Sequence, residues 1–303
     1  MTFVERWLSA SEIKGAPVCV GLDPVLGKLP PEVKQGLGDN DREAVAKAFE
    51  TFCLGVIDAV ADAVPCVKPQ LACFERYGSA GFAAYERVVA AAKQAGLLVI
   101  ADAKRGDIGI SAKHYAAAFL GGELPGSADA LTVSPYLGPD TLEPFIETAE
   151  ANGKGVFVLV RTSNPGSGVW QGLETADASR VVDHVADYVQ RESDARRGDD
   201  PFGPVGAVVG ATHPREAAAL RQRMPHVLFL VPGFGAQGGG ADDVKACFDA
   251  SGRGAIITAS RSVIYGPPEA GQAWQDAVRV AAINLRDAID RAIQVPKPSR
   301  RMA

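Results

Sequence analysis

The chain has 303 residues, of which 47% are hydrophobic, and it carries 31 basic and 36 acidic side chains. That length and apolar content suit one large domain with a single core, as in an α/β barrel. The net charge of −5 argues against binding of nucleic acid and against attachment to an anionic membrane. An anionic ligand would therefore need a local cluster of basic side chains.

The amino terminus and the cysteines give no sign of secretion. The opening segment MTFVERWLSASEIKG lacks a basic stretch followed by an apolar one, and no apolar run approaches membrane-spanning length. The five cysteines are odd in number and form no C-x-x-C pair, which favours reduced thiols over a disulfide framework. We therefore expect a soluble, cytoplasmic protein.

Eight short apolar runs, rich in β-branched residues, predict the strands of a covered parallel sheet. The runs are Val18–Leu22, Val64–Lys68, Leu97–Asp102, Ala130–Val133, Gly155–Val160, Val205–Val209, Val227–Val231 and Gly254–Thr258. Ala-rich segments with helical spacing lie between them, among them Arg42–Ala63, Phe82–Ala95 and Ala176–Arg191. This alternation favours a single-domain (β/α)8 barrel (TIM barrel) over residues 1–294, with an open doubly wound sheet as the alternative. The basic, proline-containing end, residues 295–303, is expected to be disordered.

Polar side chains recur where the predicted strands end. In a closed barrel these positions meet at the carboxyl-terminal face, where the active sites of such barrels are built. The residues are Asp23, Lys68, Asp102, Lys104, Ser134, Thr162, Ser163, His213, Gln237 and Arg261. We therefore expect them to surround one site.

The segment VIADAKRGDIG, residues 99–109, places Asp102, Lys104 and Asp107 directly after an apolar run. Asp102 and Lys104 would share one strand face because side chains alternate along a strand with period two. A fixed carboxylate disfavours a substrate carboxylate nearby, and a protonated lysine can protonate the carbanion left when CO₂ departs. The cluster therefore suits decarboxylation, with a salt-bridge network at the barrel rim as the alternative.

The segment GFGAQGGG, residues 233–240, follows the seventh predicted strand and contains G-x-G-x-x-G. As a dinucleotide fingerprint it is weak, because it lies far from an amino-terminal βαβ unit. A phosphate cradle is the preferred interpretation, since glycine lets backbone N–H groups approach an anion. Gln237 would donate from its amide and Arg261 would supply forked, charged donors. A glycine-rich turn without a ligand is the alternative.

These motifs resemble, in chain order, those of the orotidine 5′-monophosphate decarboxylase family, in particular its longer bacterial branch. DAKRGDIG resembles the family signature D-x-K-x-x-D-I, and further segments match at most of the predicted strand ends. They are VGLDP at 20–24, VKPQLACFERYG at 67–78, TVSPYLG at 132–138, RTSNPG at 161–166, VPGFGAQGG at 231–239 and ASRSVIYG at 259–266. The resemblance covers nearly the whole barrel.

The resemblance implies decarboxylation of orotidine 5′-monophosphate to uridine 5′-monophosphate and CO₂ in de novo pyrimidine biosynthesis, with no cofactor and no metal. Lys104 would protonate C6 of the pyrimidine, and Asp102 would face the departing carboxylate. Lys68 would hold the array and touch the ribose. Asp107 would reach into the site of a neighbouring subunit, which implies a homodimer with shared active sites.

The resemblance also implies how the rest of the substrate is held. Asp23 would bind the ribose hydroxyls, and Ser163, with Thr162 as the alternative, would bind the pyrimidine edge. Ile108 and Ser111 would accompany Asp107 across the dimer interface, with Ser111 where many relatives have Thr. The remaining substrate-binding positions it implies are Pro232, Gln237 and Arg261.

Two other functions stay open at this point. The first is an Mg²⁺-dependent sugar-phosphate lyase or aldolase of the same superfamily, although such relatives typically carry an acidic residue where this chain has Lys68. The second is a catalytically silent phosphate-binding barrel. The histidines show no zinc-ligand spacing, and no G-x-S-x-G segment supports a serine hydrolase.

Overall fold

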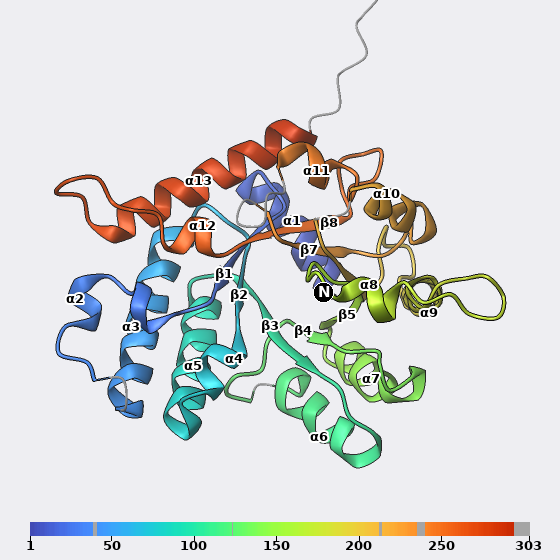
Figure 1. Cartoon of the computed structure of the whole chain (residues 1–303), viewed down its shortest axis with the longest axis horizontal. Helices are drawn as coiled ribbons and strands as arrows, with labels where there is room; N and C mark the ends of the chain where they lie inside the picture. Colours follow the sequence, from blue (N-terminus) through green and yellow to red (C-terminus); the bar gives the residue numbers. More distant parts are fainter. Residues whose placement is uncertain (39–40, 123, 212–213, 235–239, 294–303) are drawn as a thin grey trace, which may run out of the picture.

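The computed structural model describes residues 1–38, 41–122, 124–211, 214–234 and 240–293. Eight parallel strands close into a barrel in the order β1 to β8, and helices surround it (Figure 1). This closure confirms the predicted (β/α)8 barrel and shows that the open-sheet alternative is wrong. The predicted disordered end, 295–303, lies outside the described residues.

All eight predicted strands are present. They are β1 (Val18–Leu22), β2 (Cys66–Pro69), β3 (Leu98–Arg105), β4 (Ala130–Val133), β5 (Gly155–Arg161), β6 (Val205–Val209), β7 (Phe229–Pro232) and β8 (Ala255–Ala259). The largest boundary differences are that β2 begins at Cys66, not Val64, that β7 begins at Phe229, not Val227, and that β3 continues to Arg105. The extension of β3 places Lys104 within the strand, together with Asp102, which the prediction already included.

The helices that precede, follow and flank these strands lie around the barrel or across one of its ends. They are α1 (Phe3–Lys14), α2 (Pro31–Lys34), α3 (Arg42–Val60), α4 (Leu71–Glu75), α5 (Gly78–Gln94), α6 (Gly109–Leu120), α7 (Glu143–Ala151), α8 (Ser167–Gln171), α9 (Val181–Arg196), α10 (Pro214–Arg223), α11 (Ala241–Lys245), α12 (Arg261–Ile264) and α13 (Trp274–Ile293), with 3-10 turns η1 (Leu26–Lys28) and η2 (Pro139–Thr141). Helix α9 begins five residues after the predicted Ala176, because Ala178 is left-handed with φ 63° and so cannot lie in an α-helix. No helix among the residues the structure describes is long and apolar enough to cross a lipid bilayer.

The amino-terminal end of the barrel is closed by α1. Phe3, Val4 and Trp7 are almost fully buried and pack in one cluster with side chains from inside the barrel. Phe3 meets Phe157 of β5 edge to face, with ring centroids 5.8 Å apart. Apolar side chains thus fill this end, which leaves the opposite, carboxyl-terminal end for a ligand.

Candidate active site

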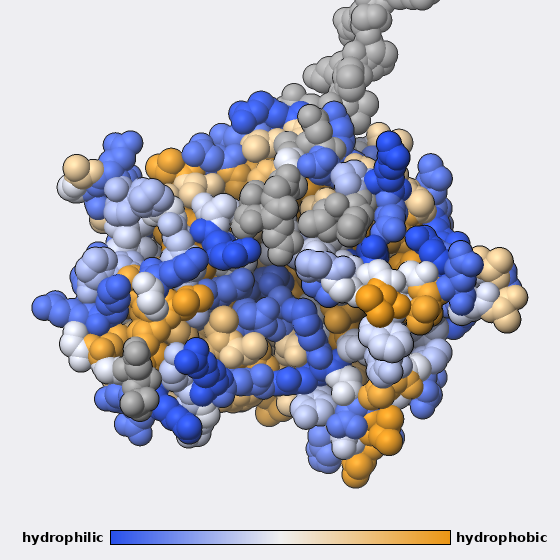
Figure 2. Space-filling view, viewed as in Figure 1, coloured by the Kyte–Doolittle hydropathy of each residue, from blue (hydrophilic) through white to orange (hydrophobic). Residues whose placement is uncertain are grey.

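A cavity of about 420 Å³ opens at the carboxyl-terminal end of the barrel. Figure 2 shows this face hollowed at its centre, with hydrophilic residues in the hollow. Its lining includes Asp23, Lys68, Gln70, Asp102, Lys104, Thr132, Leu159, Thr162, Ser163, Val208, Leu230, Pro232, Thr258 and Arg261. The predicted convergence of polar strand ends is therefore confirmed for Asp23, Lys68, Asp102, Lys104, Thr162, Ser163 and Arg261.

The Asp102 carboxylate lies at the centre of the polar floor. Its Oδ2 accepts from the Lys68 ammonium and from Gln70 Nε2 at 3.1 Å. Its Oδ1 accepts from Lys104 Nζ at 2.5 Å and from the Thr132 hydroxyl at 3.1 Å. Each oxygen thus has one cationic and one neutral donor, so the carboxylate has little freedom to turn.

Burial and charge oppose each other at this carboxylate. Burial alone would raise the pKa of Asp102, but the charges and hydrogen bonds of Lys68 and Lys104 outweigh it and hold that pKa well below its usual range. Burial would likewise lower the pKa of Lys68, yet Asp102 and then Asp23 raise it well above its usual value. The carboxylate and the Lys68 ammonium therefore both stay charged at neutral pH.

The end of β3 departs from regular strand geometry where the array is built. The pairing with β4 shifts register between Ala101 and Arg105, and Lys104 has a φ of 48°. Such a bulge changes the direction in which a side chain points. Asp102 and Lys104 do meet, as predicted, but through this bulge and not through plain alternation along the strand.

The segment after β1 is held close to the end of β8. A Cβ on Gly21 would lie 1.9 Å from the Ser260 hydroxyl, so the VGLDP segment needs glycine there. The Tyr265 hydroxyl donates to the Asp23 carbonyl oxygen at 2.9 Å and accepts from Val25 N at 2.7 Å. Asp23 Oδ1 is buried and, among the described residues, has no hydrogen-bond partner. A bound hydroxyl could supply one.

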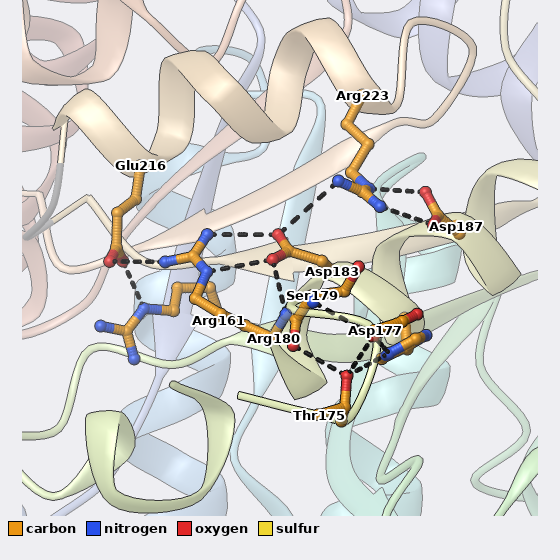
Figure 3. A network of polar contacts seen from close by, with 10 residues as sticks. Arg161, Thr175, Asp177, Ser179, Arg180, Asp183, Asp187, Glu216 and Arg223 are labelled. Atoms are coloured by element: carbon orange, nitrogen blue, oxygen red, sulfur yellow. Dashed lines mark hydrogen bonds and ion pairs between the residues drawn. The ribbon is translucent and has the colours of Figure 1, made fainter. Parts of the chain in front are cut away.

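A buried arginine organises the segment after β5. Arg161 donates to Glu216 of α10, to the Ser167 hydroxyl at 2.8 Å and to Gln171 Oε1 at 3.2 Å; Figure 3 shows the arginine–carboxylate network around Glu216. Gln171 in turn accepts from Thr162 N and donates to the Thr162 hydroxyl. The segment that carries Thr162 and Ser163 is therefore fixed at the cavity edge.

Some predicted site residues do not line this cavity, and Ser134, which follows β4, is one of them. Asp107, Ile108 and Ser111 follow β3 but are outside its lining, and Asp107 Oδ1 accepts from Ile108 N at 2.8 Å. Gln237 and His213 lie outside the described residues. In the part of the chain that the structure describes, no group of three or more His, Cys, Asp or Glu residues could hold a metal ion.

Several lining residues were missed by the sequence analysis. Gln70 and Thr132 both contact Asp102, and Thr258 has a buried hydroxyl with no partner among the described residues. Thr132 and Thr258 are single polar residues inside otherwise apolar strands, which is a signal that could have indicated them. Leu159, Val208 and Leu230 form an apolar part of the lining that polar motifs could not reveal.

Known proteins are similar to this chain in sequence and in fold. The family described as "Orotidine 5'-phosphate decarboxylase / HUMPS family" matches residues 16–277. The chain belongs to this family. It is 47% identical to orotidine 5'-phosphate decarboxylase of Rhodopirellula baltica over 95% of this chain and 98% of that protein. It is 42% identical to that of Deinococcus radiodurans over 97% and 99% of the two chains.

Solved structures agree with this assignment. A putative orotidine 5'-phosphate decarboxylase from Streptomyces avermitilis superposes with a TM-score of 0.83 at 38% identity, over 96% of each chain. The match confirms the barrel as the family fold. The predicted family and the predicted carboxy-lyase class are confirmed by these comparisons together.

Proposed function

We propose that this chain decarboxylates orotidine 5′-monophosphate to uridine 5′-monophosphate through its own side chains, without a cofactor. The observation that carries the proposal is the Asp102 carboxylate, kept ionised between Lys68 and Lys104 at the floor of the cavity. A site that only bound a carboxylated ligand would gain nothing from an opposing carboxylate. In a site that expels the ligand's carboxylate as CO₂, the same repulsion favours the reaction, because it is relieved in the transition state.

The chemical step follows from this placement. The substrate carboxylate faces Asp102, and their repulsion is relieved as the C6–carboxyl bond breaks and neutral CO₂ leaves. The bonding electron pair stays on C6, where the Lys104 ammonium stabilises it and then donates a proton to it. Lys104 regains its proton from water, so neither an oxidant nor a metal is needed to balance the reaction.

The apolar lining supports the same step. Leu159, Val208 and Leu230 border the same cavity as the charged residues. Low-polarity surroundings strengthen the electrostatic interactions of Asp102 and Lys104. They also suit neutral CO₂ better than the substrate carboxylate.

The remaining lining residues suit the rest of a nucleotide. Asp23, with its unpartnered Oδ1, would accept from ribose hydroxyls. The Thr162 hydroxyl already donates to Asn164 and accepts from Gln171, which favours Ser163 for the pyrimidine edge. Arg261 and Pro232 would meet the phosphate, together with Gln237.

We further propose a cytoplasmic homodimer with shared sites. Asp107 lies outside the cavity of its own chain, and its neighbours Ile108 and Ile110 are 62% and 72% exposed. Tyr136 and Leu137, which follow β4, are also exposed. Ser134 N donates to the Arg105 carbonyl at 2.8 Å, which joins the two loops at one rim. Pairing of this rim would cover the apolar residues and carry Asp107 toward the partner's substrate.

The test is the loss of ultraviolet absorbance as orotidine 5′-monophosphate is converted by the purified protein in excess chelator. We expect rapid conversion of orotidine 5′-monophosphate under these conditions. No conversion by folded protein in chelator, with turnover of a sugar phosphate once Mg²⁺ is restored, would instead favour the metal-dependent branch of the superfamily.

A further inference from the structure

The Thr132 hydroxyl connects the two groups on which the proposed chemistry depends. Thr132 Oγ1 accepts from the backbone N–H of Lys104 at 3.0 Å and lies 3.1 Å from Asp102 Oδ1, to which it donates. The Ala101 carbonyl, at 3.5 Å, is the longer alternative for the same proton. Thr132 borders the cavity but is only 1% exposed, so its side chain has little access to water in place of these contacts.

The first contact acts on the backbone of Lys104. This residue has φ 48°, a left-handed conformation that is uncommon for a residue with a side chain. It occurs in the register shift of β3 against β4, where regular ladder hydrogen bonds are interrupted. Thr132 Oγ1 supplies an acceptor for the Lys104 N–H there, and without it the bulge would lose a hydrogen bond that holds it.

The second contact acts on the carboxylate. Asp102 Oδ1 is the oxygen that Lys104 Nζ contacts at 2.5 Å. The same hydroxyl therefore fixes both ends of the Lys104–Asp102 pair: the backbone from which the lysine extends and the oxygen that it meets.

Thr258 shows that this arrangement is not a general property of polar residues in the barrel. It is also buried, at 3% exposure, and it borders the same cavity. Its hydroxyl has no hydrogen-bond partner among the described residues, whereas that of Thr132 is placed between two groups of the array.

We infer that Thr132 is a positioning residue for the proton transfer, setting the direction from which Lys104 approaches C6. This inference rests on the proposed function. It requires that loss of the hydroxyl act on the chemical step more than on binding, because the groups assigned to ribose, pyrimidine and phosphate are Asp23, Ser163 and Arg261. None of these lies on β4: Asp23 follows β1, Ser163 follows β5 and Arg261 follows β8.

The experiment compares T132V, which keeps the side-chain shape, with T132S, which keeps the hydroxyl. We expect kcat for orotidine 5′-monophosphate to fall about 10- to 100-fold in T132V, as for an unpaired buried polar group, with KM changed less than about threefold. T132S should recover most of the loss. T148V, which removes the Thr148–Pro144 hydrogen bond in α7, should match the wild type.

Crystal structures of the variants make the result independent of turnover. In T132V we expect Lys104 to leave positive φ, or its Nζ to move out of hydrogen-bond distance of Asp102; in T132S both should stay. If T132V retains both the positive φ of Lys104 and the Lys104–Asp102 hydrogen bond, or retains wild-type kcat, the inference is wrong. Decarboxylation by the wild type would still stand. A wild type that does not decarboxylate would contradict the proposed function instead, and the structures alone would then decide the role of Thr132 in placing Lys104. If T132V does not fold, T132A takes its place in the kinetic measurements and in the crystal structures.

Discussion

Lys104 Nζ lies 2.5 Å from Asp102 Oδ1, although the two residues belong to one strand and Lys104 has a left-handed backbone. A non-glycine residue with positive φ is strained, and such strain persists where the surrounding structure enforces it. Here the surroundings are the β3 bulge, Thr132 and the buried carboxylate. The end of β3 therefore holds the Lys104 ammonium in a fixed direction, in addition to continuing the sheet.

Loss of the Asp102 charge should destabilise the fold as well as stop the reaction. In Asp102→Asn the buried Lys68 ammonium loses its ion-pair partner, which should lower the free energy of unfolding by about 3 kcal/mol. Asp187→Asn is the matched control, because the Asp187–Arg223 pair is exposed and should contribute at most about 1 kcal/mol. Urea unfolding measures the free energy of unfolding of both variants. Equal decreases in the free energy of unfolding would show that the buried ion pair stabilises the fold no more than the exposed one.

Replacement of Arg261 should weaken phosphate recognition selectively. In Arg261→Ala, we expect the affinity for uridine 5′-monophosphate to fall about 100-fold, because a charged, forked donor to the phosphate is lost. The affinity for uridine, which lacks the phosphate, should hardly change. Titration calorimetry with both ligands checks this. A similar loss for uridine would place Arg261 elsewhere in the site.

Two inactive variants should complement each other if the sites are shared. Lys104→Ala and Asp107→Ala each remove one half of the proposed site. After subunit exchange in an equal mixture, half of the dimers are hybrids, and each hybrid has one complete site. Activity should then return to about a quarter of the wild-type value. If mass spectrometry shows complete subunit exchange and the mixture remains inactive, Asp107 does not act in the partner's site.

Lys154 should give the fold a pH-dependent contribution at alkaline pH. It borders a separate cavity of about 860 Å³, between α5 and the segments that precede β4 and β5, and donates to the Gly122 carbonyl at 3.1 Å. Burial, together with the charge of Lys93, lowers the pKa of Lys154 from 10.5 to about 8. Between these pH values the folded chain binds fewer protons at Lys154 than the unfolded chain does, so this residue makes stability rise with pH.

The test is the difference in free energy of unfolding between wild type and Lys154→Met. It should shift in favour of the wild type by up to about 3 kcal/mol from pH 8 to 10.5. Lys34→Met, which removes an exposed lysine, controls for the loss of a charge. A difference that stays constant over this range would contradict the account of Lys154.

The sequence predicted the barrel because its strands read as continuous apolar runs at regular intervals, a pattern set by burial on both faces. It placed β1, β4 and β6 at their observed bounds. It ended the third strand at Asp102, since charged residues do not look like buried strand. Local composition cannot show that Arg105 continues the pairing with β4 past a register shift.

The site was predictable to the extent that its residues are charged and follow strands. Gln70 and Thr132 were not identified, because their importance comes from contacts with Asp102 made across neighbouring strands. The left-handed backbone at Lys104 could not be predicted either. It depends on an acceptor supplied 28 residues later in the chain.

The most direct test of the account is single-turnover conversion of orotidine 5′-monophosphate by Lys104→Ala, beside a titration of the same variant with uridine 5′-monophosphate. We predict a folded variant that still binds the product while conversion is lost, because the proton donor to C6 is gone. Conversion at the wild-type rate would contradict it, since the charged array would then have no part in the chemical step.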